Sequence, residues 1–213
     1  MGGLTAERKL FGTDGVRGEA GTFLSAELAL SLGRAATASL EASRPQVLIV
    51  RDTRESGPML ESALAAGVAE AGGDALLGGV LPTPAAAVLV RKLGLDLAAV
   101  VSASHNPYRD NGIKFFSGAG TKLDDATEAR MEAMLEAGPP PADAGHVREL
   151  EGGAEDYLRA LESAFPLDLS GVKVALDCAN GATHRVAPAI FERLGAEVEA
   201  IAVEPDGRNI NAG

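Results

Sequence analysis

The chain has 213 residues, of which 46% are hydrophobic and only 4% aromatic, so its core consists mainly of aliphatic side chains. The formal net charge of −11 argues against binding to nucleic acid or to an anionic membrane surface. No apolar run reaches the roughly 18 residues that a membrane span needs, and the single cysteine, Cys178, excludes an internal disulfide. We therefore expect a cytoplasmic protein.

The first hundred residues alternate between helical and extended patterns. In chain order they predict a helix at 25–42, a strand at 47–51, a helix at 57–71, a strand at 75–80, a helix at 84–93 and a strand at 97–101. This alternation is typical of parallel βαβ units with right-handed crossovers. Ser25 is the expected N-cap of the first helix. Thr83 is the expected cap of the third, with Pro84 in its first turn.

The next segment predicts a hairpin and then a helix. Residues 113–116 and 121–123 indicate two short strands joined at 117–120, and a helix capped by Asp124 or Asp125 extends to residue 137. Three consecutive prolines within 138–143 mark the best linker candidate. We expect the first domain to end at residue 140.

Residues 141–213 predict one further βαβ unit, with a helix at 154–165, a strand at 172–177, a helix at 182–194 and a strand at 197–203. A single unit of this kind cannot bury both faces of a sheet. We therefore expect an incomplete second α/β domain, either part of a longer protein or completed by a partner. Its exposed sheet edge and apolar surface leave self-association into an oligomer open.

The strongest functional signal follows the strand at 97–101, in the run Ser102-Ala103-Ser104-His105-Asn106-Pro107. Asn106-Pro107 indicates a turn just past a buried strand, at the edge where α/β sheets bind ligands. Lys114 follows ten residues after Ser104, close enough to return to this turn.

Three roles are open for Ser104 on this evidence. It could be a nucleophile with His105 as its base, a helix cap, or the carrier of a phosphoryl group stabilised by nearby cations. The first role is disfavoured because the Gly-x-Ser-x-Gly elbow of serine hydrolases is absent.

A second candidate is Phe11-Gly12-Thr13-Asp14-Gly15-Val16-Arg17-Gly18. Its glycines allow the backbone to approach an anion, with Arg17 as a bidentate phosphate clamp. A tight turn with a surface arginine explains the pattern equally well. Residues 82–84 fit a loop-to-helix corner, 177–182 fit a simple βα turn, and Cys178 fits a core position.

Together these motifs resemble those of the α-D-phosphohexomutase superfamily. The resemblance rests on Gly12-Thr13-Asp14-Gly15-Val16-Arg17-Gly18, Pro82-Thr83-Pro84, Ser102–Pro107 and Asn111-Gly112-Ile113-Lys114. The bacterial phosphoglucosamine mutase branch looks most similar, through Lys9-Leu10-Phe11, Phe115-Phe116-Ser117 and Asn209-Ile210-Asn211-Ala212-Gly213. The resemblance implies a three-layer α/β/α domain with a mixed sheet at 1–140 and an incomplete second α/β domain at 141–213.

The resemblance also implies a chemistry. In the family the serine that matches Ser104 carries a phosphoryl group, gives it to a sugar monophosphate, and takes the other phosphate back from the resulting bisphosphate. Glucosamine 6-phosphate and glucosamine 1-phosphate would be interconverted. Arg17, Thr13, Asn106 and Lys114 would bind substrate or its phosphate. His105 would orient the site, and Lys114 would stabilise charge or move a proton.

Two alternatives to this function remain. Phosphomannomutase/phosphoglucomutase is the nearest one inside the superfamily, and a non-catalytic module that binds sugar phosphate is the one outside it. The loop that selects the sugar in the family has no match in this chain, so the sequence does not decide between the sugars.

The family's Mg²⁺ is held by the phosphoserine and by three aspartates of an Asp-Gly-Asp-x-Asp-Arg loop. No Asp-x-Asp-x-Asp occurs in this chain, so Ser104, through its phosphate, is the one expected metal ligand. Because Mg²⁺ usually needs one or two carboxylates or further phosphates, we expect the 213-residue chain by itself to be inactive as a mutase.

Overall fold

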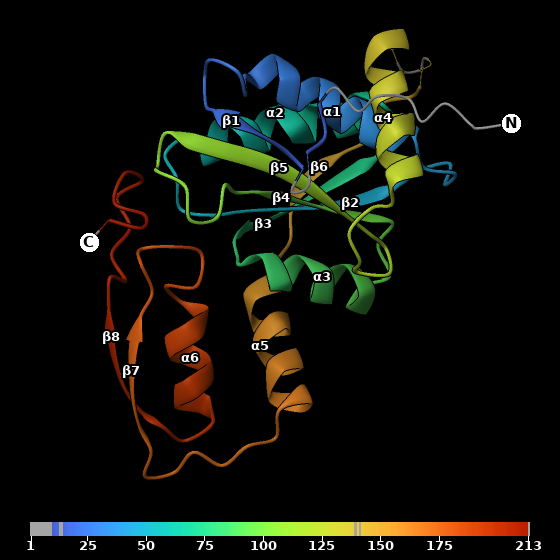
Figure 1. Ribbon diagram of the computed structural model, residues 1–213. Coiled ribbons are helices and arrows are strands. Elements are labelled where there is room, and N and C mark those ends of the chain that lie inside the picture. Colours follow the sequence, from blue (N-terminus) through green and yellow to red (C-terminus); the bar gives the residue numbers. More distant parts are fainter. Residues whose placement is uncertain (1–9, 13–14, 139, 141, 213) are drawn as a thin grey trace, which may run out of the picture.

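A six-stranded sheet between two helical layers forms the main body of the protein, which we describe from a computed structural model covering residues 10–12, 15–138, 140 and 142–212 (Figure 1). The strands are β1 (Val16–Glu19), β2 (Gln46–Arg51), β3 (Asp74–Val80), β4 (Leu97–Val101), β5 (Asp110–Ser117) and β6 (Val147–Glu149). They lie in the order β1-β5-β4-β2-β3-β6. Strand β5 is antiparallel to both of its neighbours and the other pairings are parallel, which confirms a mixed sheet.

The helices divide between the two faces of this sheet (Figure 1). One layer contains α1 (Ala26–Ala38), α2 (Gly57–Glu70) and α4 (Asp125–Ala137), and the other contains α3 (Thr83–Lys92), against which α5 (Gly153–Ala164) packs. The central strands are apolar on both sides, as buried parallel strands are. In β4, for example, Ala99 and Val101 enter the core below the first layer, whereas Ala98 and Val100 enter the core that faces α3.

The residues after α5 form a smaller unit of β7 (Lys173–Asp177), α6 (Val186–Arg193) and β8 (Glu197–Ile201). Strands β7 and β8 are parallel and make a two-stranded sheet. Val186 of α6 joins Tyr157 and Leu158 of α5 in the core that faces α3, so this unit packs on the α3 side of the main sheet. Ile201 remains 59% exposed.

The helix signals of the sequence are partly confirmed. The backbone N–H of Leu28 donates to Ser25 Oγ at 3.1 Å, and that of Thr127 donates to Asp124 Oδ1 at 2.7 Å, so both predicted caps form. The expected cap at Thr83 is wrong. Helix α3 already includes Thr83, and Pro82 stands at the N-cap without a side-chain hydrogen bond.

The predicted hairpin at 113–123 forms only in part: the chain turns at 117–120, where the Ser117 N–H donates to the Thr121 carbonyl at 2.8 Å. Residues 121–123 form no strand and contribute one isolated bridge, between Phe116 and Lys122. Strand β5 instead pairs along its length with β4 and β1. Ile113 and Phe115 lie in one core and Phe116 packs against the other. Burial on both faces thus favours a central strand over a local hairpin.

Two strands lack a sequence signal. Strand β1 reads Val-Arg-Gly-Glu, and β6 reads Val-Arg-Glu with every residue exposed, so neither shows the β-branched or alternating pattern of a typical strand. Because β6 pairs with β3, the main sheet includes residues beyond the expected domain boundary at 140. Within the described residues no helix is long and apolar enough to cross a membrane.

Asp74, at the start of β3, holds the segment that leads into β6. Its Oδ1 accepts from the Arg44 guanidinium at 3.1 Å and from the His146 backbone N–H at 2.9 Å. The hydrogen bond from Arg44 is the main cause that lowers the pKa of Asp74 from 3.8 to about 2.

Asp74→Asn should therefore destabilise the protein in a pH-dependent way. A carboxyl with a lowered folded-state pKa stabilises the fold above its ordinary pKa and loses this contribution as the pH falls through the folded value. The difference in unfolding free energy between the unchanged protein and Asp74→Asn should shrink in urea titrations from about pH 5 towards about pH 2.5. Asp143→Asn, which changes an exposed aspartate nearby, should have little effect at any pH, and an equal effect of the two variants would contradict the role of Asp74.

Candidate functional site

Ser104 lies in the turn between β4 and β5 with its side chain exposed. Its backbone φ is 56°, in the left-handed region that residues other than glycine rarely adopt. A residue held in this conformation costs on the order of 1 kcal/mol, so the surrounding structure must stabilise the turn.

Arg54, in the loop after β2, supplies this stabilisation. Its guanidinium is fully buried and donates to three carbonyls of the turn. Nη2 donates to the Ser104 carbonyl at 2.8 Å and the Asn106 carbonyl at 3.0 Å, and Nη1 donates to the Pro107 carbonyl at 2.6 Å. One buried cation therefore fixes the path of the backbone on both sides of His105.

Asp52 balances the charge of Arg54 and connects it to the serines. Its Oδ2 accepts from Arg54 Nε at 2.9 Å and from the Ser102 hydroxyl at 2.7 Å. Ser102 Oγ in turn accepts the backbone N–H of Ser104 at 3.1 Å. The Ser102 hydroxyl is thus engaged as donor and acceptor, which leaves Ser104 as the exposed hydroxyl of the two.

The other predicted residues of the turn have different roles. His105 is exposed beside Ser104. Asn106 donates from Nδ2 to Asp110 Oδ2 at 2.9 Å, so its side chain braces the far end of the turn. Thr13 lies outside the described residues.

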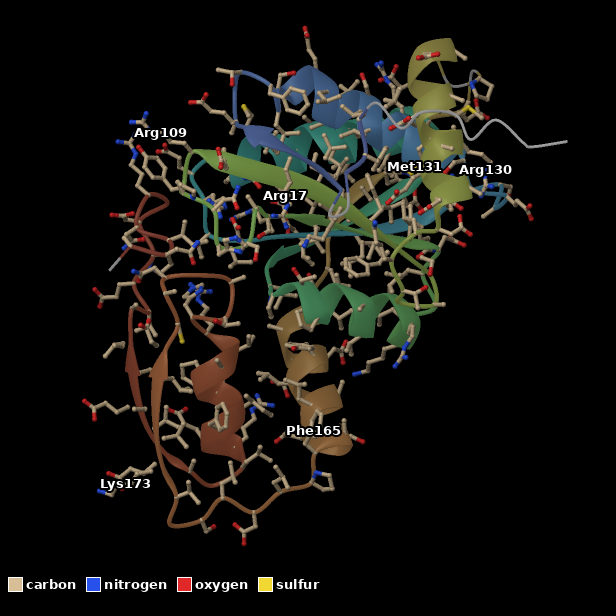
Figure 2. All side chains as sticks on the ribbon, in the orientation of Figure 1. Arg17, Arg109, Arg130, Met131, Phe165 and Lys173 are labelled. Carbon is tan, nitrogen blue, oxygen red and sulfur yellow. The ribbon has the colours of Figure 1, made fainter. Side chains whose placement is uncertain are left out.

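Arg17 and Lys114 reach the same face of the sheet from β1 and β5. Arg17 pairs with Gly112, and the Ser102 N–H donates to the Gly112 carbonyl at 2.9 Å. A Cβ at Gly112 would lie 2.9 Å from Arg17 Cγ and 2.8 Å from the Ser102 carbonyl oxygen, so the Arg17 side chain passes directly over this glycine. Arg17 is labelled in Figure 2. Lys114 is two residues further along β5, opposite Val100. The strand register thus places Arg17 and Lys114 on one face of the sheet, with Arg17 beside Gly112.

The sequence reasoning missed three residues of this site, namely Asp52, Arg54 and Asn211. The first two follow β2, which is parallel to β4 and adjacent to it. Since the carboxyl ends of adjacent parallel strands meet at one edge, the Arg-Asp-Thr-Arg run at 51–54 was the available signal. Asn211 lies in the run at 209–213 that carried part of the family resemblance, but the run gave no sign of a contact with the serine turn, because that contact depends on how the C-terminal segment folds back.

The C-terminal segment docks beside the serine turn (Figure 1). Asn211 Nδ2 donates to the Ser104 carbonyl at 3.0 Å and to the Asn106 carbonyl at 3.3 Å. Arg208 Nε donates to Glu55 Oε2 at 2.6 Å, and the Glu55 N–H donates to the Gly207 carbonyl at 2.9 Å. The loop after β2 thus contacts both the serine turn and the end of the chain.

Comparison with known proteins agrees with this geometry. The family described as phosphoglucomutase/phosphomannomutase, alpha/beta/alpha domain I, matches residues 8–140. The chain belongs to the phosphoglucomutase/phosphomannomutase family.

Curated relatives of this family extend beyond the matched domain. A phosphoglucosamine mutase of Chromobacterium violaceum is 52% identical over 96% of this chain, and one of Moorella thermoacetica is 52% identical over 95%. The chain covers 48% of each of these relatives, so it spans about half of their length.

Solved structures of the family share the fold. A phosphoglucomutase/phosphomannomutase family protein from Burkholderia thailandensis superimposes with a TM-score of 0.80 at 28% identity, covering 91% of this chain and 43% of that one. The parafusin (phosphoglucomutase) of Paramecium reaches a TM-score of 0.73 at 16% identity, covering 93% and 44% of the two chains. The α/β architecture is therefore that of the family.

The described residues do not by themselves fit the Mg²⁺ that the family resemblance implies. No group of three His, Cys, Asp or Glu side chains among them is placed to hold a metal ion. Asp52, the carboxylate linked to the serine turn, is already engaged by Arg54 and Ser102. Any ion at Ser104 would thus need further ligands from outside this set.

A cavity of about 540 Å³ lies between the carboxyl ends of β2 and β3 and the start of α6. Its lining includes Arg51, His184 and Arg185. Burial is the main cause that lowers the pKa of His184, and the nearby Arg185 acts in the same direction. None of the predicted site residues lines this cavity, so it is not the centre of the predicted site.

Arg54→Met should destabilise the protein strongly, because it leaves the buried Asp52 carboxylate without its cation and removes one donor from each of three turn carbonyls. We expect a loss of about 3–5 kcal/mol in the free energy of unfolding, measured by urea unfolding at neutral pH. Arg208→Ala removes an exposed ion pair with Glu55 and should cost about 1 kcal/mol or less. Similar losses in the two variants would contradict the buried role of Arg54.

Proposed function

We propose that this chain supplies the phosphoserine-bearing domain of an enzyme that interconverts glucosamine 6-phosphate and glucosamine 1-phosphate. The observation that carries the proposal is the exposed Ser104 hydroxyl, held in a left-handed turn by a fully buried arginine. The kind of sugar is inferred from relatives that are named phosphoglucosamine mutase and are about half identical to this chain.

The proposed reaction transfers a phosphoryl group twice. Phosphorylated Ser104 gives its phosphoryl group to the free hydroxyl of a sugar monophosphate, so the Oγ–P bond breaks and a sugar O–P bond forms. The sugar hydroxyl loses its proton, and Ser104 Oγ gains one to become a hydroxyl again. The bisphosphate then reorients. Ser104 Oγ then accepts the other phosphoryl group, so a sugar O–P bond breaks and the Oγ–P bond forms again. Ser104 loses its hydroxyl proton, the sugar oxygen gains one, and the isomeric monophosphate leaves.

The chain's own residues support this chemistry through position and charge. Phosphoryl transfer gains most from alignment of the reacting groups and from neutralisation of the phosphate charge. Arg17 is suited to hold phosphate through two parallel hydrogen bonds. Lys114, on the same face of the sheet, is suited to stabilise charge or to move a proton, and His105 is suited to orient the substrate beside Ser104. Mg²⁺ would add charge neutralisation when bound.

A phosphomannomutase or phosphoglucomutase is the second candidate, because the Burkholderia structure with the same fold carries that family name. Both candidates use the same serine chemistry and differ in the sugar. Rates measured with glucosamine, mannose and glucose 6-phosphates decide between them.

Ser104→Ala should abolish turnover, because no hydroxyl remains to carry the phosphoryl group. In the protein translated from the complete reading frame that contains this chain, we expect the rate of conversion of glucosamine 6-phosphate to fall by at least about 1,000-fold, with an unchanged circular dichroism spectrum. Ser163→Ala, an exposed serine on α5, is the matched control and should retain the full rate. A near-normal rate of Ser104→Ala with bisphosphate supplied would exclude Ser104 as the carrier.

The 213-residue chain alone should not convert glucosamine 6-phosphate. The described residues lack a metal-binding group, and the sequence contains no Asp-x-Asp-x-Asp loop. A coupled assay for glucosamine 1-phosphate with purified chain and Mg²⁺ tests this. Turnover that depends on Ser104 would show that these 213 residues suffice for the reaction.

A further inference from the structure

We infer that Asn211 is a positioning residue for Ser104, acting with Arg54 as a two-sided clamp on the carbonyls of the serine turn. This inference rests on the proposed function, because it assigns to Asn211 the task of aligning the phosphoryl carrier. It concerns a residue that touches the backbone of the turn and not the reacting atoms.

The clamp is defined by two carbonyls that share the same two donors. The Ser104 carbonyl accepts from Arg54 Nη2 at 2.8 Å and from Asn211 Nδ2 at 3.0 Å. The Asn106 carbonyl accepts from the same two nitrogens at 3.0 and 3.3 Å. The two donors come from separate parts of the chain, one from the loop after β2 and one from the segment after β8.

This arrangement bears directly on the orientation of the Ser104 side chain. Ser104 has a φ of 56°, so its conformation is strained and depends on outside contacts. Its carbonyl group belongs to the peptide that follows it. Releasing that carbonyl from one donor allows the peptide plane to rotate and the Ser104 Oγ to shift. A misplacement of about 1 Å is enough to slow a positioned reaction by about 100-fold.

Asn211 is itself held in place independently of its side-chain contacts. Its backbone N–H donates to the Ala179 carbonyl at 2.9 Å, and the preceding segment is tied to the loop after β2 by the Glu55 N–H, which donates to the Gly207 carbonyl at 2.9 Å. Its φ is 58°, a conformation that asparagine tolerates and glycine adopts freely. Replacing Asn211 by glycine therefore removes the donor and keeps the backbone.

The test compares Asn211→Gly with Arg208→Ala in the protein translated from the complete reading frame. Each variant, first freed of phosphate with a phosphatase, is mixed with a series of concentrations of glucosamine 1,6-bisphosphate, and the appearance of phosphorylated protein is followed by intact mass. We expect the maximal rate of phosphorylation for Asn211→Gly to fall by about 10-fold or more, with a half-saturating concentration within about two-fold of the unchanged protein. Arg208→Ala should keep its rate within about two-fold, since its loss leaves the clamp in place.

Conservative replacement separates positioning from a general structural role. Asn211→Gln keeps an amide donor and should recover part of the rate, whereas Asn211→Asp offers only acceptors to the two carbonyls and should be as slow as Asn211→Gly. Equal rates for Asn211→Gly and the unchanged protein would overturn the inference, as would equal losses in Asn211→Gly and Arg208→Ala. If Ser104 in the unchanged protein takes up no phosphate, the proposed function fails and this inference fails with it.

Discussion

The buried guanidinium of Arg54 is the constraint on which the candidate site depends. A fully buried cation must be balanced and must have its donors satisfied. Here the balance comes from Asp52, and the remaining donors go to three carbonyls of a single turn. The same interactions that make Arg54 tolerable in the interior also force the turn into the left-handed conformation that exposes Ser104.

The topology of the sheet brings these groups together. Strands β2 and β4 are parallel neighbours, so Asp52 and Arg54, which follow the first, meet Ser102 and Ser104, which follow the second. The antiparallel strands β5 and β1 then add Lys114 and Arg17 on one face. The backbone of the turn is held by the loop after β2 and by the C-terminal segment.

Much of this architecture follows from sequence patterns, because burial dictates them. Strand β4 was predicted with its observed limits, because a short run of five apolar residues is typical of a fully buried strand. Ser25 and Asp124 were predicted as caps because their side chains satisfy local donors. The elements that were missed or only partly predicted depend on distant partners. Strand β6 is exposed and forms by pairing with β3, and β5 extends beyond its predicted residues because it pairs with β4 and β1, where Ile113 and Phe115 are buried in the core.

The candidate site shows the same division. The sequence pointed to Ser104, His105, Asn106, Arg17 and Lys114 through motifs that are local in the chain. The sequence did not indicate the role of Arg54, because an arginine is expected on the surface unless buried partners for it are known. It also did not indicate the contact of Asn211 with the serine turn, because Ser104 lies 107 positions away in the chain. Long-range hydrogen bonds of this kind leave no periodic trace in a sequence.

The central claim is that Ser104, and not Ser102, carries the phosphoryl group. The most direct measurement is mass spectrometry of the protein from the complete reading frame after incubation with glucosamine 1,6-bisphosphate. Tryptic cleavage after Lys92 and Arg109 yields a peptide whose serines are Ser102 and Ser104. We expect a gain of about 80 Da on this peptide, with fragment ions that place the phosphate on Ser104. Phosphate on Ser102, or no gain on this peptide, would contradict it.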